Sequence, residues 1–503
     1  MITWGISANS HDAALAVFET KKKGLGPNQS LELKFASHTE RFSGVKNDAH
    51  LNKEIINYAR QWGEPNEIIW YERPGLKTLR QFRAGQGLQF RENNINRYLR
   101  SYGVSTPVRF VSHHLAHAAA GYYTSPFSEA TVVCIDSIGE FESLTIWEAN
   151  GTNLKKTYTQ SYPHSVGLWY SAMTQRIGLK PNEDEYILMG MAAYGNPSRL
   201  FMDILNDFID KDGIGYSPSI KIKHNLHRGC KWWRPDLTTE QDMFDIAAAT
   251  QKVYEYILTN TLLWASKNTK SKNLVLMGGC ALNCSANNIA YNYFDNVWIM
   301  PNPGDAGSAV GAVLAHKKLH MPMPHVNLGY NIEGEYTVEE VLHELLTTGI
   351  CGVASGRAEF GPRAFGHRSL LADPRGTDIK DRVNEIKRRQ KFRPFAPAVL
   401  EEHASAYFDG YVSPFMQYTA TCTDPGLPAI VHGDGTSRVQ TVSATQSMGF
   451  RKLLERWYEE TGCPILLNTS LNIKGQPIVN TVEDAQEFEK HYGVKVCTAA
   501  ATT

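Results

Sequence analysis

Residues 356–375 read GRAEFGPRAFGHRSLLADPR, and residues 356–369 of this stretch are rich in glycine and arginine and follow the apolar run Gly352–Ala354. We predict that this run is a strand and that the arginines at its end are held in place by the surrounding glycines, proline and aromatic residues. Planar guanidinium groups bind phosphates and carboxylates through paired hydrogen bonds. The stretch therefore predicts an anion site in an α/β domain, with structural ion pairs as the alternative interpretation.

Further basic and polar segments follow this stretch. Lys387-Arg388-Arg389 precedes FRPFAPAVL (392–400), and the segment DGTSRVQ (434–440) carries another arginine. The apolar run Pro464–Leu467 then leads into NTSLN (468–472), which offers neutral hydrogen-bond donors. A hydrogen-bonded turn without a ligand would explain NTSLN equally.

A change in pattern near LHMPMPHVNL (319–328) marks the expected domain boundary, because Pro322 and Pro324 break any helix there. We place one domain at 1–325 and a second at 326–503. A helix over Thr337–Leu346 is expected to open the second domain. In the first, short apolar runs and helical periodicity alternate, which predicts a mixed α/β fold. The expected elements are a β-hairpin over Ile2–Ser7 and Ala13–Phe18 with His11 and Asp12 at its tip, strands over Ala130–Ile135 and Asn273–Met277, and helices over Leu51–Trp62 and His114–Tyr123.

The segment VSHHLAH (111–117) predicts a metal site. Ser112 is suited to the N-cap of the following helix, on which His113 and His117 share one face. Such a pair binds a cation from a rigid helix, and solvent-facing histidines are the alternative. Asp136 follows an apolar strand and Asp305 stands in PGDAGS (303–308), so we expect all four side chains to meet at one ion. Capping of turns or helices is the alternative for either aspartate.

Glycines lie at two further points of the first domain. MGGCALN (277–283) puts two glycines after a predicted strand, and Gly304, Gly307 and Gly311 surround Asp305. Backbone N–H groups at such positions approach phosphate oxygens. Neither segment is a Walker loop or a dinucleotide fingerprint, and tight packing without a ligand is the alternative.

The composition excludes several classes of protein. Lys plus Arg equal Asp plus Glu at 51 each, so the chain lacks the basic excess of a protein that binds nucleic acid by charge. Its apolar stretches are much shorter than the ~18 to 20 residues of a membrane span, and its start does not resemble a signal peptide. The eight scattered cysteines are expected to be reduced thiols of a cytoplasmic protein.

Taken together, GRAEFGPRAFGHRSLLADPR, FRPFAPAVL and NTSLN resemble the NodU/CmcH family of O-carbamoyltransferases, and the resemblance runs from Ile6 to Asp484. It implies a duplicated N-terminal domain of the actin/Hsp70/sugar-kinase type and a smaller C-terminal YrdC-like α/β domain. The C-terminal domain would form carbamoyl-adenylate from carbamoyl phosphate and ATP. The N-terminal domain would transfer the carbamoyl group to a hydroxyl of a small-molecule acceptor, sugar-like or nucleotide-like, beside a metal, typically Fe²⁺.

The resemblance also implies roles for individual residues. His11 is the candidate for accepting the acceptor's proton, and Arg363 and Arg393 are the candidate catalytic arginines. The expected metal ligands are His113, His117, Asp136 and Asp305. The residues expected near the adenylate are Gly278, Gly279 and Asn283. Those expected to hold carbamoyl phosphate and the phosphates of ATP are Arg363, Arg368, Lys387, Arg393, Arg438 and Asn468.

Some positions depart from the family pattern. The family usually has DG-x-GE where this chain has Asp136-Ser137-Ile138-Gly139-Glu140, and a lysine at Ile187. Leu471 and Gln476 replace the usual Phe and Glu, and the chain ends soon after Asp484. We expect these departures to affect the acceptor and the efficiency more than the class of reaction.

Two other functions compete with this one. A threonylcarbamoyl-type transferase acting on tRNA would run analogous half-reactions, but the neutral total charge argues against it. A non-catalytic nucleotide-binding regulator could use the same fold.

A last clue concerns the acceptor: cations and aromatic residues are interleaved over 77–100 and 223–234. Such patches bind phosphorylated or nucleotide-like groups, and a solvated helix face is the alternative.

Overall fold

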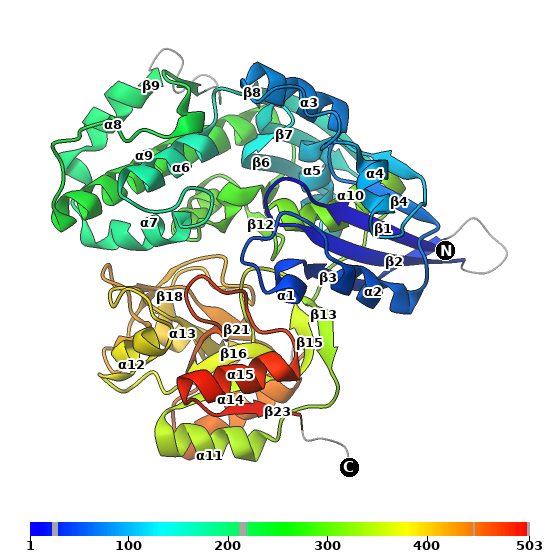
Figure 1. Cartoon of the computed structure of the whole chain (residues 1–503). Helices are drawn as coiled ribbons and strands as arrows, with labels where there is room; N and C mark the ends of the chain where they lie inside the picture. The colour runs from blue at the N-terminus through cyan, green and yellow to red at the C-terminus, as the bar shows by residue number, and fades with distance from the viewer. Residues whose placement is uncertain (23–28, 211–217, 219, 446–447, 500–503) are drawn as a thin grey trace. The chain divides into compact units, whose positions relative to one another are not determined.

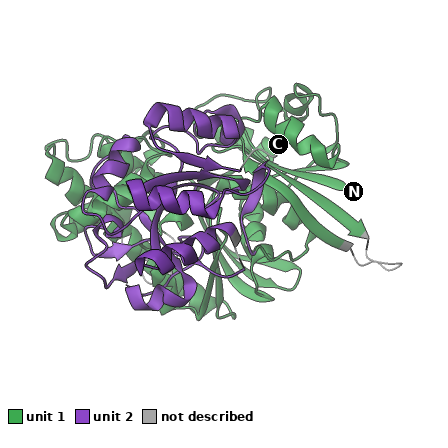
Figure 2. Ribbon diagram, turned by 90° about the horizontal axis from the view of Figure 1, so that it is seen from below, with its two compact units in different colours: residues 1–39, 47–323 green, residues 40–46, 324–503 purple. Residues whose placement is uncertain are grey.

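The computed structural model describes residues 1–22, 29–210, 218, 220–445 and 448–499. The chain forms two compact units, coloured separately in Figure 2. Unit 1 comprises residues 1–39 and 47–323, and unit 2 comprises residues 40–46 and 324–503. The break at Met323 and Pro324 falls within the proline-containing connection. The short helix α1 (Glu40–Ser43) belongs to unit 2, although it is far from the rest of that unit in the sequence.

Unit 1 contains two five-stranded sheets with the same strand order (Figure 1). One sheet has the order β3 (Gln29–His38), β2 (Ala14–Lys22), β1 (Ile2–Ser7), β4 (Glu67–Trp70) and β5 (Val108–Phe110). The other has the order β8 (Asn153–Ser161), β7 (Glu142–Asn150), β6 (Glu129–Gly139), β11 (Asn273–Met277) and β12 (Asn296–Ile299). In both, the first strand in sequence is central, antiparallel to the next strand and parallel to the later ones. The expected duplicated α/β domain is thus confirmed.

The predicted hairpin and strands are present, with one difference at β6. Ser7 pairs with Ala14 across the hairpin of β1 and β2, so residues 8–13 form its tip. Strand β6 runs on to Gly139, and its pairing with β7 shifts register after Ile135. Asp136 therefore lies at an irregularity within the strand and not after its end, because the bulge lets the chain continue pairing beyond the apolar run.

Two helices cross between the sheets of unit 1. Helix α5 (His113–Thr124) packs on β6 and β11, while α10 (Ser308–Lys317) packs on β1 and β4. Their backbones approach closely, because a Cβ added to Gly311 would lie 1.9 Å from the carbonyl oxygen of Ala116. Only glycine fits such a contact. The crossing brings the beginnings of both helices to the same region of unit 1.

Further helices complete unit 1. They are α2 (Lys53–Ala59), α3 (Pro74–Arg83), α4 (Ile95–Arg100), α6 (Val166–Arg176), α7 (Glu185–Met191), α8 (Phe201–Phe208) and α9 (Glu240–Asn268), and a small ribbon of β9 (Ile209–Asp210) and β10 (Lys221–Ile222) follows α8. Thr239 and Asp242 form a capping box at the start of α9. Among the described helices, none is both long enough and apolar enough to cross a membrane.

Unit 2 is built on one mixed sheet of six strands. Its order is β21 (Gln440–Val442), β17 (Ala396–Leu400), β22 (Ile465–Ser470), β16 (Arg368–Ala372), β14 (Ile350–Ala354) and β23 (Val496–Thr498). Successive strand residues face opposite sides: Leu371 lies in one apolar cluster, and Leu370 and Ala372 lie in the other. Helices α11 (Val338–Thr348) and α14 (Met448–Thr461) contribute to the first cluster, while α12 (Ile379–Ile386) and α15 (Val482–Tyr492) contribute to the second. The expected C-terminal α/β domain is confirmed.

Smaller elements complete unit 2. They are the ribbon of β13 (Asn327–Ile332) and β15 (Gly356–Glu359), the three-stranded sheet of β18 (Phe408–Asp409), β19 (Ala420–Cys422) and β20 (Thr436–Ser437), and the helix α13 (Ala404–Tyr407). Asn468, Thr469 and Ser470 lie within β22, where they pair with β16. The expectation that Asn468 follows the strand is therefore wrong, because this polar segment continues the ladder. All eight cysteines are free, as expected.

Candidate functional site

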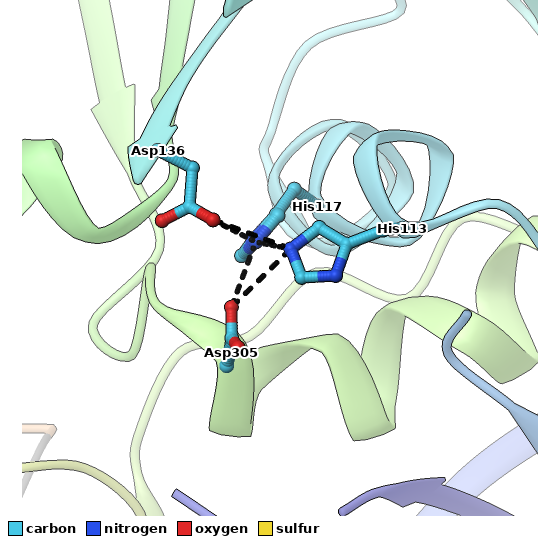
Figure 3. Close-up of side chains that lie close together, drawn as sticks. All are labelled: His113, His117, Asp136 and Asp305. Carbon is cyan, nitrogen blue, oxygen red and sulfur yellow. Dashed lines mark hydrogen bonds and ion pairs between the residues drawn. The ribbon is translucent and has the colours of Figure 1, made fainter. Parts of the chain in front are cut away.

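Four side chains meet at one point in unit 1 (Figure 3). One ligand atom each from His113, His117, Asp136 and Asp305 lies within 4.8 Å of the others. The Nε2 atom of His113 is 3.3 Å from a carboxylate oxygen of Asp136 and 3.3 Å from one of Asp305. The Nε2 atom of His117 is 3.3 Å from Asp305. The side chains that the sequence proposed for one ion are thus brought together by the fold.

The crossing of α5 and α10 explains this convergence. His113 is the first residue of α5 and His117 lies one turn later, while Asp305 opens the short 3₁₀ helix Asp305–Gly307 that precedes α10. Asp136 comes from the bulge in β6. Ser112 occupies the N-cap position with an extended backbone, but its side chain makes no capping hydrogen bond.

Burial and charge make this site suitable for a cation. The side chains of His113 and His117 are 1% and 0% exposed, so the solvent-facing interpretation is wrong. Burial raises the pKa of Asp305, but the two histidines hold it well below its usual range. Burial lowers the pKa of His113, but Asp305 and Asp136 hold it well above its usual range.

The donor atoms themselves fit a metal ion. The Nε2 atoms of His113 and His117 face each other at 3.0 Å, so both cannot carry a proton, and both also face carboxylate oxygens. A divalent cation would satisfy all four groups at once. The Nδ1 atom of His117 lies 3.2 Å from the hydroxyl of Ser308, which orients the ring.

The three residues expected near an adenylate lie beside this cluster. The N–H of Gly279 donates to the carboxylate of Asp136 at 3.2 Å. Gly278 has a φ of 88°, and a Cβ there would lie 2.1 Å from the carbonyl oxygen of Ile135. Asn283 exchanges two hydrogen bonds with Gln251. The two glycines therefore allow close packing against β6, and they place backbone N–H groups next to Asp136.

His11 lies at the tip of the first hairpin. Its Nδ1 atom is 3.3 Å from the carboxylate of Asp12. Burial lowers the pKa of His11, but the hydrogen bond to Asp12 and the charges of Asp12 and Asp305 raise it to about 9. His11 is thus protonated at neutral pH while Asp12 and Asp305 are ionised, so it would have to lose this proton before it could accept one from a hydroxyl.

The arginines proposed for unit 2 differ in their surroundings. Arg368 is fully buried, and its guanidinium donates to five backbone carbonyls, which belong to Tyr330, Ser355, Gly356, His367 and Asn480. A guanidinium has five N–H donors. In this structure Arg368 has no donor left for a phosphate and instead ties the loop to its neighbours.

Lys387, like Arg368, uses its hydrogen-bond donors on protein acceptors. Its ammonium donates to the carbonyl of Ser470 and to the carbonyl and side-chain oxygens of Asn472. Burial, followed by the nearby charges of Arg389 and Arg393, lowers the pKa of Lys387 well below its usual range. Lys387 therefore fixes the end of β22, and a second role toward a phosphate would require these bonds to exchange.

Arg438, Arg363 and Asn468 are better placed for a ligand. Arg438 has no hydrogen-bond or ion-pair partner among the described residues, although its Nε is covered from solvent. Arg363 donates to the carbonyl of Phe415 beside a hollow lined by Phe365, Phe415 and Gln440. The side-chain amide of Asn468 donates to the carbonyl of Ala364 and to Gln440, so its buried oxygen, which has no partner, is what remains for a ligand.

The structure also shows residues that sequence reasoning missed. One carboxylate oxygen of Glu359 accepts N–H bonds from Phe365 and His367, which shapes the arginine-rich loop. Gly139 lies against His113, because a Cβ there would be 2.1 Å from the imidazole ring. An acidic residue within the arginine-rich segment was the available signal for Glu359, whereas nothing local distinguishes Gly139.

The protein is thus an α/β protein of two units. The first is duplicated and holds a buried cluster of two histidines and two aspartates, and the second is a separate α/β unit. Two family models match the chain: Carbamoyltransferase N-terminus over residues 77–314 and Carbamoyltransferase C-terminus over residues 342–501.

Named proteins support the same assignment. The chain is 34% identical to the nodulation protein NolO of Bradyrhizobium diazoefficiens, over 75% of each chain. It is 29% identical to the 3'-hydroxymethylcephem-O-carbamoyltransferase of Amycolatopsis lactamdurans, over 96% of this chain and 95% of that one. An uncharacterized protein of Synechocystis is 32% identical over 96% of this chain and 93% of its own length. The chain belongs to the O-carbamoyltransferase family and is an enzyme of that family.

Proposed function

We propose that this enzyme forms carbamoyl-adenylate from carbamoyl phosphate and ATP in unit 2 and transfers the carbamoyl group to a hydroxyl of a small molecule in unit 1. The observation that carries the proposal is the convergence of His113, His117, Asp136 and Asp305 in a chain of this family. The Amycolatopsis relative, whose name specifies a hydroxymethyl acceptor, supports a small-molecule acceptor.

The first half-reaction is assigned to unit 2. Hydrolysis of carbamoyl phosphate yields carbamate and phosphate, and the carbamate oxygen then attacks the α-phosphorus of ATP and displaces pyrophosphate. Positive charge must stabilise the phosphoryl oxygens during this displacement. Arg438 is our leading candidate for stabilising these oxygens, because it has no competing partner among the described residues. The further candidates for binding the phosphates are Arg363, Arg393 and Asn468. Arg368 and Lys387 would keep their neighbours in position.

The second half-reaction is assigned to unit 1. The acceptor oxygen attacks the carbamoyl carbon, the bond to the adenylate oxygen breaks, and AMP leaves with its charge. His113, His117, Asp136 and Asp305 would hold a divalent metal, with Fe²⁺ as our expectation, which would polarise the carbamoyl carbonyl. Backbone groups of Gly278 and Gly279 lie beside Asp136 and are our candidates for contacting the adenylate, together with Asn283. His11, oriented by Asp12, is the candidate for accepting the proton of the hydroxyl once it has lost its own.

A product assay tests the proposal. The protein is incubated with carbamoyl phosphate, ATP and an extract of hydroxylated metabolites, and pyrophosphate, AMP and carbamoylated products are measured. We expect that pyrophosphate is released only when carbamoyl phosphate is present. Carbamoylated product should require both carbamoyl phosphate and ATP. The variant Arg438→Met should lose pyrophosphate release, while Arg382→Met, an exposed arginine on α12, should retain it. Absence of pyrophosphate from the wild-type protein would show that the proposed first half-reaction is wrong.

A further inference from the structure

The end of helix α3 meets a distant segment in unit 1. Gln86, just after α3, lies 3.3 Å from the imidazole Nε2 of His227, which belongs to the 3₁₀ helix Leu226–Arg228. The ring of His227 is 6.4 Å from that of Tyr162, and Asn225 donates to the hydroxyl of Tyr162 at 2.7 Å. The two cationic segments singled out in the sequence, 77–100 and 223–234, are therefore parts of one surface.

Three arginines on this surface have no hydrogen bond or ion pair to an acidic residue among the described residues, although the charge of Glu72 acts on the first: Arg80, Arg83 and Arg228. Cations earlier in the same helix region are paired, because Arg73 binds Glu140 and Lys77 binds Glu72. We call the three arginines together with His227 the arginine surface.

The charges of Arg80, Arg228 and His227 lie close enough to act on one another, and Glu72 offsets that of Arg80 only in part. The Nε of Arg80 is covered from solvent and has no hydrogen-bond partner. Burial lowers the pKa of His227, and the charges of Arg80 and Arg228 lower it further. Like charges held together, with that of Arg80 partly buried, are unfavourable unless an anion joins them. The arrangement is the one expected of an anion site that binds its ligand from solution.

This surface is also tied to the histidine and aspartate cluster. Arg73 anchors the start of α3 to Glu140 in the turn between β6 and β7. In the same turn, Gly139 lies against His113, and the guanidinium of Arg83 is 5.3 Å from the ring centre of Phe141. Gly139 and Phe141 are only two residues apart, which spans at most about 7 Å of chain, so this turn connects Arg83 to the cluster.

We propose that Arg80, Arg83, Arg228 and His227 hold an anionic group of the acceptor, a phosphate or a carboxylate, while its hydroxyl reaches the carbamoyl group. This inference rests on the proposed function and specifies its substrate class. Guanidinium groups bind both kinds of anion bidentately. The adenylate phosphate is the other possible source of such an anion, and the experiment separates the two.

Binding of inorganic phosphate to the full chain, measured by calorimetry, is the first arm of the test. Arg80→Met should weaken one phosphate-binding event at least tenfold. Arg80→Lys should weaken it less, and Arg100→Met, an exposed arginine on α4 without a partner among the described residues, should not change it. Equal phosphate binding by the wild type and both Arg80 variants would overturn the proposal. If Arg80→Met does not fold, the comparison of Arg80→Lys with the wild type decides.

The second arm identifies the source of the anion. Pyrophosphate release from ATP and carbamoyl phosphate should be unchanged in Arg80→Met, while carbamoylated products from a metabolite extract should fall at least tenfold. A tenfold rise in the KM for ATP or carbamoyl phosphate would assign the site to the adenylate and overturn the inference about the acceptor. Failure of the wild type to release pyrophosphate would instead contradict the proposed function, and phosphate binding at Arg80 would still be measurable.

Discussion

The substitution Gly139→Ala tests whether the ring position of His113 controls metal binding. A Cβ at this position would lie 2.1 Å from Cδ2 of His113 and 2.3 Å from its Cγ. Carbon atoms in favourable contact are about 3.5 Å apart, so the ring would have to retreat by roughly 1.4 Å. Metal-ligand distances tolerate only about 0.2 Å. One methyl group should therefore move one of the four donors out of the coordination sphere.

We expect metal affinity to fall by roughly 10- to 100-fold, the effect typical of lost support around a metal ligand. The assay is the metal content of protein loaded with Fe²⁺ and dialysed against graded chelator, together with the transfer rate. Gly190→Ala is the matched control, because a Cβ on this residue of α7 meets nothing within 4 Å. Unchanged metal retention and transfer in Gly139→Ala, with the fold intact, would refute the reasoning.

Three further outcomes are expected. Asp305→Asn should lose the bound metal but keep pyrophosphate release, as measured by elemental analysis and a pyrophosphate assay. Arg368→Met leaves five buried carbonyls without their donor, so its free energy of unfolding in urea should fall by about 3 to 5 kcal/mol. Burial raises the pKa of Asp434, but hydrogen bonds from His432 and Thr436 bring it down to about 2. The ionised form therefore stabilises unit 2 above about pH 4, and this contribution is lost as the pH falls toward 2. Asp434→Asn should flatten the pH dependence of stability over that range.

Local patterns were sufficient for several parts of this protein. The spacing of His113 and His117 places them on one face of any helix, because side chains four residues apart lie one above the other. Alternation of short apolar runs and turns predicted the hairpin of β1 and β2. These inferences succeeded because the geometry of a helix or a strand depends only on neighbouring residues.

Tertiary structure decided the rest. The donors His113, Asp136 and Asp305 are far apart in the sequence and meet because α5 and α10 cross, which depends on close backbone contact at Gly311. The role of Arg368 also depends on tertiary structure. The surrounding sequence suggests that Arg368 binds phosphate, but in the fold its guanidinium donates to five carbonyls that come from several elements. By itself the sequence determined which residue types are available for this chemistry. Which of them bind a ligand and which hold the fold was decided only by packing, because a donor already bonded to the protein has nothing left to offer a substrate.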